Sequence, residues 1–213
     1  MSRERVLTDI RSRLAGDTKA RHDAAVARIG ARRRNTVPER ASRAAEARVA
    51  QFEEMLARVK GTTARLARLS DVPAAVQQYL GEGARVCVDA EIDALALPWQ
   101  DTRLTHVPWA PKTGFDCIVS GCVAGAAETG TIAISSGIDA PLSRAFLGES
   151  HIVVLPSARL FGGYEDIFDL VRQGDLPRHL TFVSGPSCTG DIEMIMEYGA
   201  HGPRALHVLI IDS

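Results

Sequence analysis

The chain has 213 residues, 46% of them hydrophobic, and a formal net charge of −1. The sequence contains no run of about 18 apolar residues that could span a bilayer, and its charged start lacks the apolar stretch of a secretory signal, so we expect a cytoplasmic protein. Its four cysteines could form two disulfides, but we expect them to be reduced in that compartment.

Charge is distributed unevenly along the chain. Residues 1–70 contain 17 of the 25 Lys and Arg residues and 8 of the 26 Asp and Glu residues, a net charge of +9, which leaves −10 for residues 71–213. Most glycines and every long β-branched run lie in the second part. We therefore predict a basic N-terminal helical extension over residues 1–70 and an α/β domain over residues 71–213.

Helical periodicity dominates the basic part. Residues 2–14 carry apolar side chains at intervals of four, and residues 39–69 carry them at intervals of three and four, as amphipathic helices do. The Arg-rich residues 17–38 have little apolar content, and we expect them to be solvated or partly disordered. Interspersed acids and the lack of stacking aromatic residues disfavour a nucleic-acid arm here. We prefer a solvated helix face that docks on the acidic part or on a partner.

Strands and helices alternate from residue 72 onward. Runs of Val, Ile and Leu separated by helical segments predict a mostly parallel α/β sheet with helices on both faces. The predicted strands are residues 85–89, 104–108, 116–120, 131–135, 151–155, 180–184 and 205–211. The predicted helices are residues 73–80, 164–172 and 192–198, with a short helical or irregular passage at 123–129. Ligands of such sheets bind at the carboxyl ends of strands, so the loops there are candidate sites.

The first candidate motif is GCVAGAAETGT, residues 121–131, between two predicted strands. Its glycines have the outline of a phosphate-binding loop, but lysine occurs only at positions 19, 60 and 112, which excludes P-loop and Schiff-base chemistry at the later strand ends. Glu128 remains as a candidate base or nucleophile in an apolar, glycine-lined turn. The alternative is a carboxylate that caps neighbouring backbone.

The second motif is SGPSCTGDIE, residues 184–193, between a predicted strand and a predicted helix. Free N–H groups at a helix start suit a phosphate or a carboxylate ligand. Asp191 and Glu193 could instead satisfy the same N–H groups as helix-capping acids. Cys188 would be a thiolate candidate near that helix start, but nothing in the sequence pairs it with a histidine.

The third motif is YGAHGPR, residues 198–204, before the last predicted strand. Gly199 can end the preceding helix and Gly202 begins a turn, so His201 is predicted to lie on a loop, where histidines are often functional. Arg204 could bind a carboxylate bidentately or form a surface salt bridge. The sequence contains no C-x-x-C, H-x-H or H-E-x-x-H spacing, so we expect no metal site in this chain.

Taken together in this order, AETGT, SGPSCTGDIE and GAHGPRALHVLIID resemble the LUD-domain family, which includes lactate utilization protein C. The resemblance covers roughly residues 72–212. It implies a fold of the ribose-phosphate isomerase, glucosamine-phosphate deaminase and CoA-transferase group. It also implies a role in a multi-subunit system that oxidises L-lactate to pyruvate, with iron–sulfur clusters on partner subunits. The positions carried over from the family are Glu128, Thr129, Gly130, Thr131, Gly185, Pro186, Ser187, Thr189, Asp191, Glu193, His201, Gly202 and Pro203, whereas Cys188 and Gly190 fill variable slots.

From these features we expect a lactate utilization protein C-like subunit that holds no cofactor itself and requires iron–sulfur partners. The three motif loops would converge on a small carboxylate or phosphate, with Glu128 and His201 available for proton transfer and Arg204 among the ligand-binding residues. Two alternatives stay open. The chain could be a CoA-transferase- or cyclo-ligase-like enzyme that uses Glu128, or a non-catalytic binding module whose basic helices dock on an acidic partner.

Overall fold

A computed structural model describes residues 2–14, 16–31, 37–110, 113–137, 141–190 and 196–212. Contacts divide the chain into two units, Met1–Val37 and Pro38–Ser213. The structural division therefore falls earlier than the composition boundary near residue 70. Within the described residues, no helix is both long and apolar enough to cross a membrane.

The first unit contains two helices, α1 (Arg3–Arg13) and α2 (Thr18–Ala31), and neither buries a residue. Asp17 Oδ1 accepts a hydrogen bond of 2.9 Å from Ala20 N, which satisfies a free donor at the start of α2. Residues 18–31 form an exposed helix, which agrees with the solvated alternative of the prediction, and residues 32–36 lie outside the described residues. Apolar side chains of both helices are exposed, including Ile10 and Ile29.

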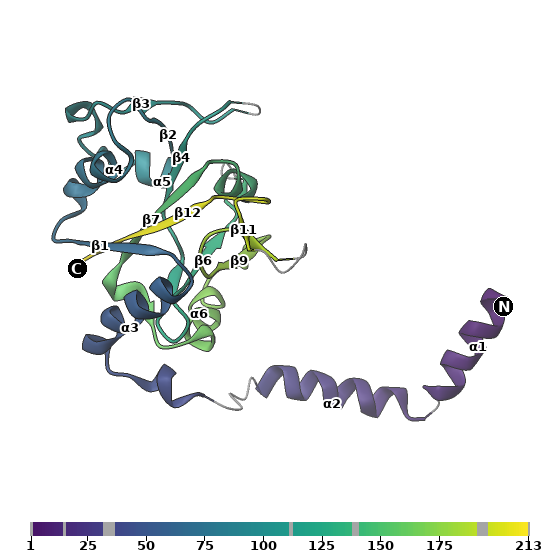
Figure 1. The fold of residues 1–213 in the computed structure, drawn as a ribbon. Helices are drawn as coiled ribbons and strands as arrows, with labels where there is room; N and C mark the ends of the chain where they lie inside the picture. The colour runs from purple at the N-terminus through teal and green to yellow at the C-terminus, as the bar shows by residue number, and fades with distance from the viewer. Residues whose placement is uncertain are drawn as a thin grey trace. The chain divides into compact units, whose positions relative to one another are not determined.

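The second unit is built on a six-stranded sheet whose strand pairs are all parallel (Figure 1). In spatial order the strands are β1 (Thr62–Leu66), β12 (Ala205–Ile211), β7 (Ser150–Pro156), β4 (Cys117–Ser120), β2 (Arg85–Val88) and β3 (Thr105–His106). The central strands are apolar on both sides because both faces of the sheet are covered. The predicted mostly parallel α/β sheet is confirmed.

One face of this sheet is covered by helices. The covering elements are α4 (Val72–Leu80), α5 (Ala90–Asp93) and the single turn η3 (Trp99–Asp101). Val72 and Val76 of α4 pack in the same core as Ile152 and Leu209, the alternate residues of β7 and β12. Pro73 fits the first turn of α4, where its missing N–H leaves no bond unmade.

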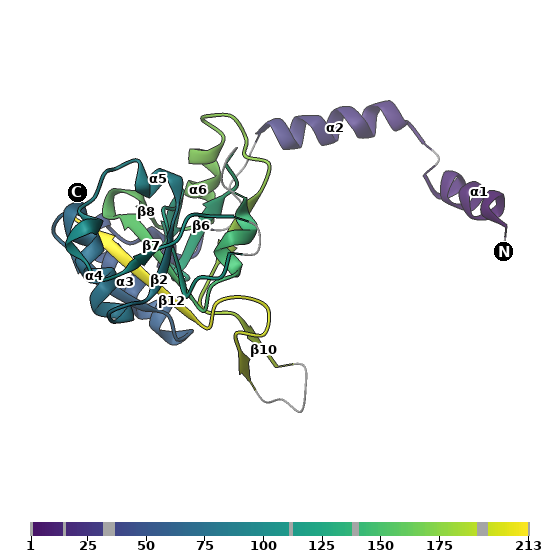
Figure 2. The ribbon, with the colours of Figure 1, turned by 90° about the horizontal axis from the view of Figure 1, so that it is seen from above.

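The other face is covered by α3 (Ala45–Arg58) and a second, four-stranded sheet, which the sequence did not predict. Its strands are β8 (Leu160–Phe161), β5 (Ala124–Ala126), β6 (Thr131–Ser135) and β9 (Leu180–Val183), in that order. Residues 124–126 thus form a strand rather than a helical or irregular passage. Helix α6 (Tyr164–Val171) packs on the outer face of this sheet. Figure 2 shows β6 and α6 on one side of β7 and β12, with α4 on the other.

The segment predicted to be helical over residues 39–69 contains several elements. The turn η1 (Glu39–Ser42) precedes α3, which ends where Lys60 adopts a φ of +64° and Gly61 N donates to Leu56 O at 3.0 Å. Strand β1 and the turn η2 (Leu69–Asp71) follow. The helical prediction was wrong for β1 because pairing with β12, far away in the sequence, overrides the local spacing.

The predicted helix over residues 192–198 is also wrong where the structure describes it. Residues 197–198 form strand β11 (Glu197–Tyr198), which pairs antiparallel with β10 (Cys188–Thr189). Lys60 Nζ lies 4.5 Å from the ring centroid of Tyr198, so a contact with the end of α3 supports the extended conformation. The described part of the second motif therefore contains one strand of this pair, β10, and the other strand, β11, lies after the motif.

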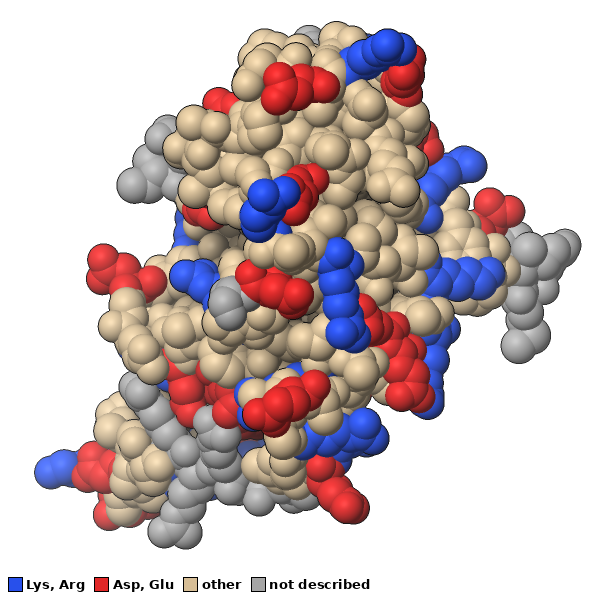
Figure 3. All heavy atoms as spheres, turned by 90° about the vertical axis from the view of Figure 1, so that its left-hand side faces the viewer, with Lys and Arg blue, Asp and Glu red and all other residues tan. Residues whose placement is uncertain are grey.

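Charged side chains of both signs are interspersed on the face of the molecule in Figure 3. Ion pairs between side chains of opposite charge include Arg65 with Glu53 at 2.5 Å and Arg68 with Asp71 at 3.0 Å. Among the described residues of this face, acidic side chains thus interrupt the basic ones, unlike the continuous basic surface that binds the phosphates of a nucleic acid.

Candidate functional site

The second and third motifs meet around a pocket of about 310 Å³. Backbone hydrogen bonds hold the two loops together, from Ser187 N to Pro203 O at 2.9 Å and from Gly199 N to Ser187 O at 3.0 Å. His201 N also donates to Ser187 Oγ, at 3.4 Å. The lining residues taken from these motifs are Ser184, Gly185, Pro186, Ser187, His201, Gly202 and Pro203. Two segments separated in sequence thus form one concave site.

A buried histidine from the central sheet also lines this pocket. His151, in β7, is 2% exposed, and burial lowers its pKa from 6.5 to about 4, so its imidazole is neutral at physiological pH. Its Nε2 lies 2.8 Å from Ser120 Oγ, and Ser120 Oγ donates to Gly121 O at 3.0 Å. A hydroxyl has one proton, so the imidazole Nε2–H must be the donor to Ser120.

The remaining walls of the pocket are apolar, formed in part by Phe146, Phe182 and Leu206. Among the described residues that line it, none is Asp, Glu, Lys or Arg. A pocket with apolar walls and a few hydroxyl, imidazole and backbone groups is typical of a small-molecule site. An anion entering it would meet no carboxylate.

The first motif reaches this region through a cluster of hydroxyl groups. Thr131 Oγ1 is hydrogen-bonded to Ser184 Oγ, to Tyr164 OH at 2.9 Å and to Thr129 Oγ1 at 2.7 Å. Thr131 is fully buried and does not line the pocket, so these bonds join strands β6 and β9 behind it. Thr131 therefore hydrogen-bonds directly to Ser184 of the second motif, and Thr129 is linked to Ser184 through Thr131.

The glycines Gly130 and Gly185 allow the motif loops to approach α3. Gly130 has a φ of +63°, and a Cβ there would lie 2.3 Å from Leu56 N. Gly185 has a φ of +112°, and a Cβ there would lie 3.0 Å from Val59 O. Both positions therefore require glycine for backbone conformation and for close packing.

Glu128 lies apart from Ser187 and His201. Its Oε2 is 3.4 Å from Arg40 Nε, its backbone N donates to Gly162 O at 3.1 Å, and its side chain is 8% exposed. Glu128 does not line the pocket formed by the other two motifs. The structure therefore brings the second and third motifs together, whereas the buried carboxylate of Glu128 pairs with the mostly exposed Arg40 of η1.

The other predicted site residues have different surroundings. Thr189 lies in strand β10 and does not line the pocket. Arg204 Nε is 3.5 Å from Glu149 Oε2 in an exposed pair, which is the surface salt bridge that the sequence left open. Asp191 and Glu193 lie outside the described residues.

The described residues contain no group of three or more His, Cys, Asp or Glu side chains that could hold a metal ion. Burial raises the pKa of the Cys117 thiol to about 12 and that of Cys87 above its usual value. Both thiols therefore stay protonated at physiological pH, and only a thiolate is a good metal ligand.

Sequence reasoning missed two groups of site residues. His151 was passed over with the scattered histidines, although a polar side chain at the start of the apolar run HIVVL was a usable signal. A second pocket contains Asp89, Ser120 and Arg144. Asp89 follows strand β2 and Ser120 ends strand β4, so the rule that ligands bind at the carboxyl ends of parallel strands could have found them.

The geometry defines an α/β protein with motif loops gathered around a small pocket, and the comparisons with known proteins identify its family. The LUD domain matches residues 113–211. A Deinococcus radiodurans protein named lactate utilization protein C is 31% identical over 153 residues, which cover 67% of this chain and 69% of that protein. The chain therefore belongs to the LUD domain family.

Further relatives agree with this assignment. Lactate utilization protein C of Bacillus subtilis is 30% identical over 92 residues, so the match spans 40% of this chain and 38% of that protein. The crystal structure of a DUF162 family protein from Deinococcus radiodurans superposes with a TM-score of 0.60 at 22% identity, covering 79% of this chain and 99% of that one. That likeness establishes the α/β fold, while membership of the ribose-phosphate isomerase group stays a prediction.

Proposed function

We propose that this chain is a cytoplasmic subunit of a system that oxidises L-lactate to pyruvate with iron–sulfur partner subunits, and that its pocket binds a small carboxylate. The carboxylate ligand is proposed because the second and third motifs meet where Ser187 and His201 line a pocket, and the described residues of that pocket include no acidic side chain. The lactate role is supported by the names of the curated relatives.

In this proposal the pocket recognises the carboxylate through neutral donors. Ser187 Oγ can donate to a carboxylate oxygen, and apolar walls such as Phe146 can contact a methyl group. His201 is exposed at the pocket, where its imidazole nitrogens can hydrogen-bond to the ligand. Electrons removed from the substrate would pass to clusters on the partners.

The basic helices support a role as a subunit. Helices α1 and α2 bury no residue of their own among those described, and isolated helices of this length are marginal in water. Their exposed apolar side chains and excess of arginine suit docking on an acidic partner. We therefore propose that these helices bind the partner subunits.

The transferase alternative finds less support in the geometry. A nucleophilic carboxylate needs access to the acyl group that it attacks, whereas Glu128 is buried beside Arg40 and lies outside the described pockets. We therefore do not assign Glu128 the role of a nucleophile.

Binding and growth measurements test the two parts of the proposal separately. Titration calorimetry on the full chain should detect binding of L-lactate or pyruvate. Ser187→Ala and His201→Asn should each weaken it about tenfold, or about 1.4 kcal/mol. His106→Asn, at an exposed histidine on β3, is the matched control and should bind normally. Equal binding by all three variants would remove the pocket assignment.

Growth of a strain that lacks the gene tests the lactate role. The deletion should impair growth on L-lactate, and the wild-type gene should restore it. Pull-down with the complete chain should recover iron–sulfur proteins, and reversal of the arginine charges in α1 and α2 should abolish that recovery. Unimpaired growth of the deletion strain would contradict the lactate role even if the pocket binds a carboxylate.

A further inference from the structure

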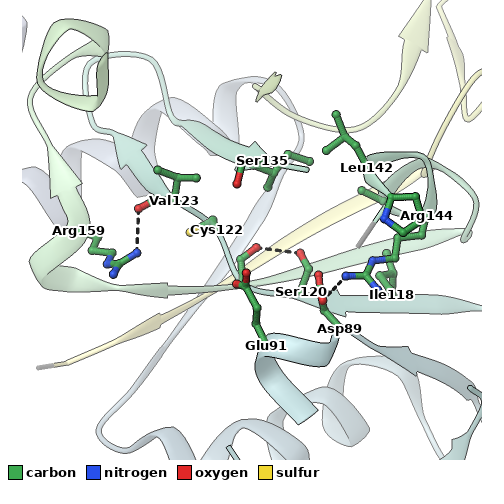
Figure 4. Close-up of a pocket in the computed structure, with 14 residues that line it drawn as sticks. Asp89, Glu91, Ile118, Ser120, Cys122, Val123, Ser135, Leu142, Arg144 and Arg159 are labelled. Atoms are coloured by element: carbon green, nitrogen blue, oxygen red, sulfur yellow. Dashed lines mark hydrogen bonds and ion pairs between the residues drawn. The ribbon is translucent and has the colours of Figure 1, made fainter. Parts of the chain in front are cut away.

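A second pocket, of about 220 Å³, lies at the carboxyl ends of β2 and β4 and faces the second sheet (Figure 4). Asp89 follows β2, Ser120 ends β4, and Ser135 ends β6 on the opposite wall. This is the part of a parallel α/β sheet where ligands bind most often. The predicted motifs contribute only Gly121, Cys122 and Val123 of the first loop to it.

Four charged side chains from three separate segments line this pocket, namely Asp89, Glu91, Arg144 and Arg159. Two of them form a buried ion pair, because Arg144 Nη2 donates to Asp89 Oδ1 and these side chains are 5% and 15% exposed. Burial of such a pair is costly relative to an apolar pair of similar volume, so it contributes shape and polarity rather than stability. Asp89 and Arg144 neutralise each other at one end of the pocket.

The other two charges have no such partner. Arg159 lies at the opposite end in Figure 4, and its Nη1 donates to Val123 O at 3.4 Å, which leaves most of its five N–H donors available. Glu91, on α5, has its Oε2 3.6 Å from the position of a Cβ built on Gly121. Within the described residues neither Arg159 nor Glu91 forms an ion pair. Among the described residues, one cation and one anion that form no ion pair thus line the same small pocket.

We propose that this pocket binds a small zwitterion of the α-amino acid type, with its carboxylate on Arg159 and its ammonium on Glu91. A guanidinium pairs with a carboxylate in fork geometry, and a carboxylate accepts from an ammonium, so both charges of the ligand are matched. A plain anion would leave Glu91 unmatched, and a plain cation would leave Arg159 unmatched. The site is separate from the carboxylate pocket and does not depend on the lactate role.

The test uses the full chain and the 20 standard L-amino acids, each measured by calorimetry and thermal shift. The tightest binder is then compared with its 2-hydroxy acid, which lacks the ammonium, and with its amide, which lacks the carboxylate. We expect the amino acid to bind at least tenfold more tightly than either analogue. Failure of all the amino acids to bind, or equal affinity for the 2-hydroxy acid, would overturn the proposal.

Two charge-removing variants assign the roles of the side chains. Arg159→Gln should weaken binding of the amino acid at least tenfold. Glu91→Gln should weaken the amino acid similarly but leave the 2-hydroxy acid unchanged or bound more tightly. Arg103→Gln and Glu82→Gln, which remove an exposed ion pair elsewhere, are the controls and should have no effect. Ser187→Ala should also leave amino-acid binding intact, which separates this site from the carboxylate pocket.

Discussion

Ser120 and His151 are joined by a buried hydrogen bond of 2.8 Å between Oγ and Nε2, across the neighbouring strands β4 and β7. Ser120 lines the pocket at the carboxyl ends of the strands, and His151 lines the pocket between the second and third motifs. One polar contact inside the core therefore belongs to the walls of both pockets.

Removal of the Ser120 hydroxyl should destabilise the fold. Ser120→Ala leaves the Nε2–H of His151 without its acceptor in a buried position, which typically costs about 1–3 kcal/mol. Urea unfolding at pH 7.5 measures the change. Ser70→Ala, at an exposed serine, is the control and should stay within about 0.5 kcal/mol of the wild type. A similar small effect for Ser120→Ala would mean that water replaces the hydroxyl.

Stability should fall as the solution is acidified below about pH 6.5. Burial lowers the pKa of His151 and His207 to about 4, so both imidazoles stay neutral in the folded chain while the unfolded chain binds their protons. Between pH 6.5 and 4 each histidine should reduce the unfolding free energy by up to about 1.4 kcal/mol per pH unit. Above pH 7 this contribution is fully present.

The histidine contribution can be isolated from that of the carboxylates. Urea unfolding of wild type and His151→Asn at pH 7.5, 6 and 5 should give a shallower pH dependence for the variant, whatever its stability at pH 7.5. Identical slopes for the two proteins would contradict the lowered pKa, because they would mean that His151 binds its proton equally in the folded and unfolded chains.

Gly130→Ala should be far more damaging than an alanine at another glycine with a positive φ. A Cβ at Gly130 would collide with the backbone of α3 at Leu56, whereas Gly83, with a φ of +78°, has no atom within 4 Å of such a Cβ. We expect Gly83→Ala to lower the free energy of unfolding by about 1–2 kcal/mol, from backbone strain alone. Gly130→Ala should lower the free energy of unfolding by more than about 3 kcal/mol or prevent folding, and thermal unfolding would measure this change. Equal losses would mean that α3 can move.

The buried pair of Arg144 and Asp89 should behave differently from an exposed one. Asp89→Ala leaves the Arg144 guanidinium buried without a counter-charge, which should cost about 3–5 kcal/mol. Adding Arg144→Met should restore part of that loss, so the double variant should be more stable than Asp89→Ala. The same cycle on Arg103 and Glu82, which are 75% and 60% exposed, should give a coupling below about 1 kcal/mol. Denaturant titrations of both cycles check this difference.

Much of the main sheet could be predicted because burial on both faces leaves a local signature. The runs HIVVL and ALHVLII are apolar throughout and form β7 and β12. Strand β1 has the short sequence TTARL, which lacks that signature and continues the spacing of the preceding helix. Its conformation depends on pairing with β12, and sequence distance hides that pairing.

The candidate site was predictable to the extent that its residues lie next to strand ends. Ser187 follows β9 of the second sheet and His201 precedes β12 of the main sheet, so their loops meet where the two sheets pack together. Glu128 also lies in a motif, but its partner Arg40 comes from a segment outside the sheet, and no local pattern indicates that pairing. Arg159 was not predicted as a site residue for a similar reason, because its pocket forms only when the two sheets pack against each other.

Strand β12 lies between β1 and β7, so residues 205–211 fill an interior position of the main sheet. During synthesis, β1 leaves the ribosome long before its hydrogen-bonding neighbour exists. The edges of β1 and β7 that pair with β12 therefore stay unpaired until β12 has been synthesised. Sheets that depend on contacts between residues so far apart in the sequence fold slowly. Chaperone binding to these edges would give the emerging chain time to complete its sheet without joining another copy.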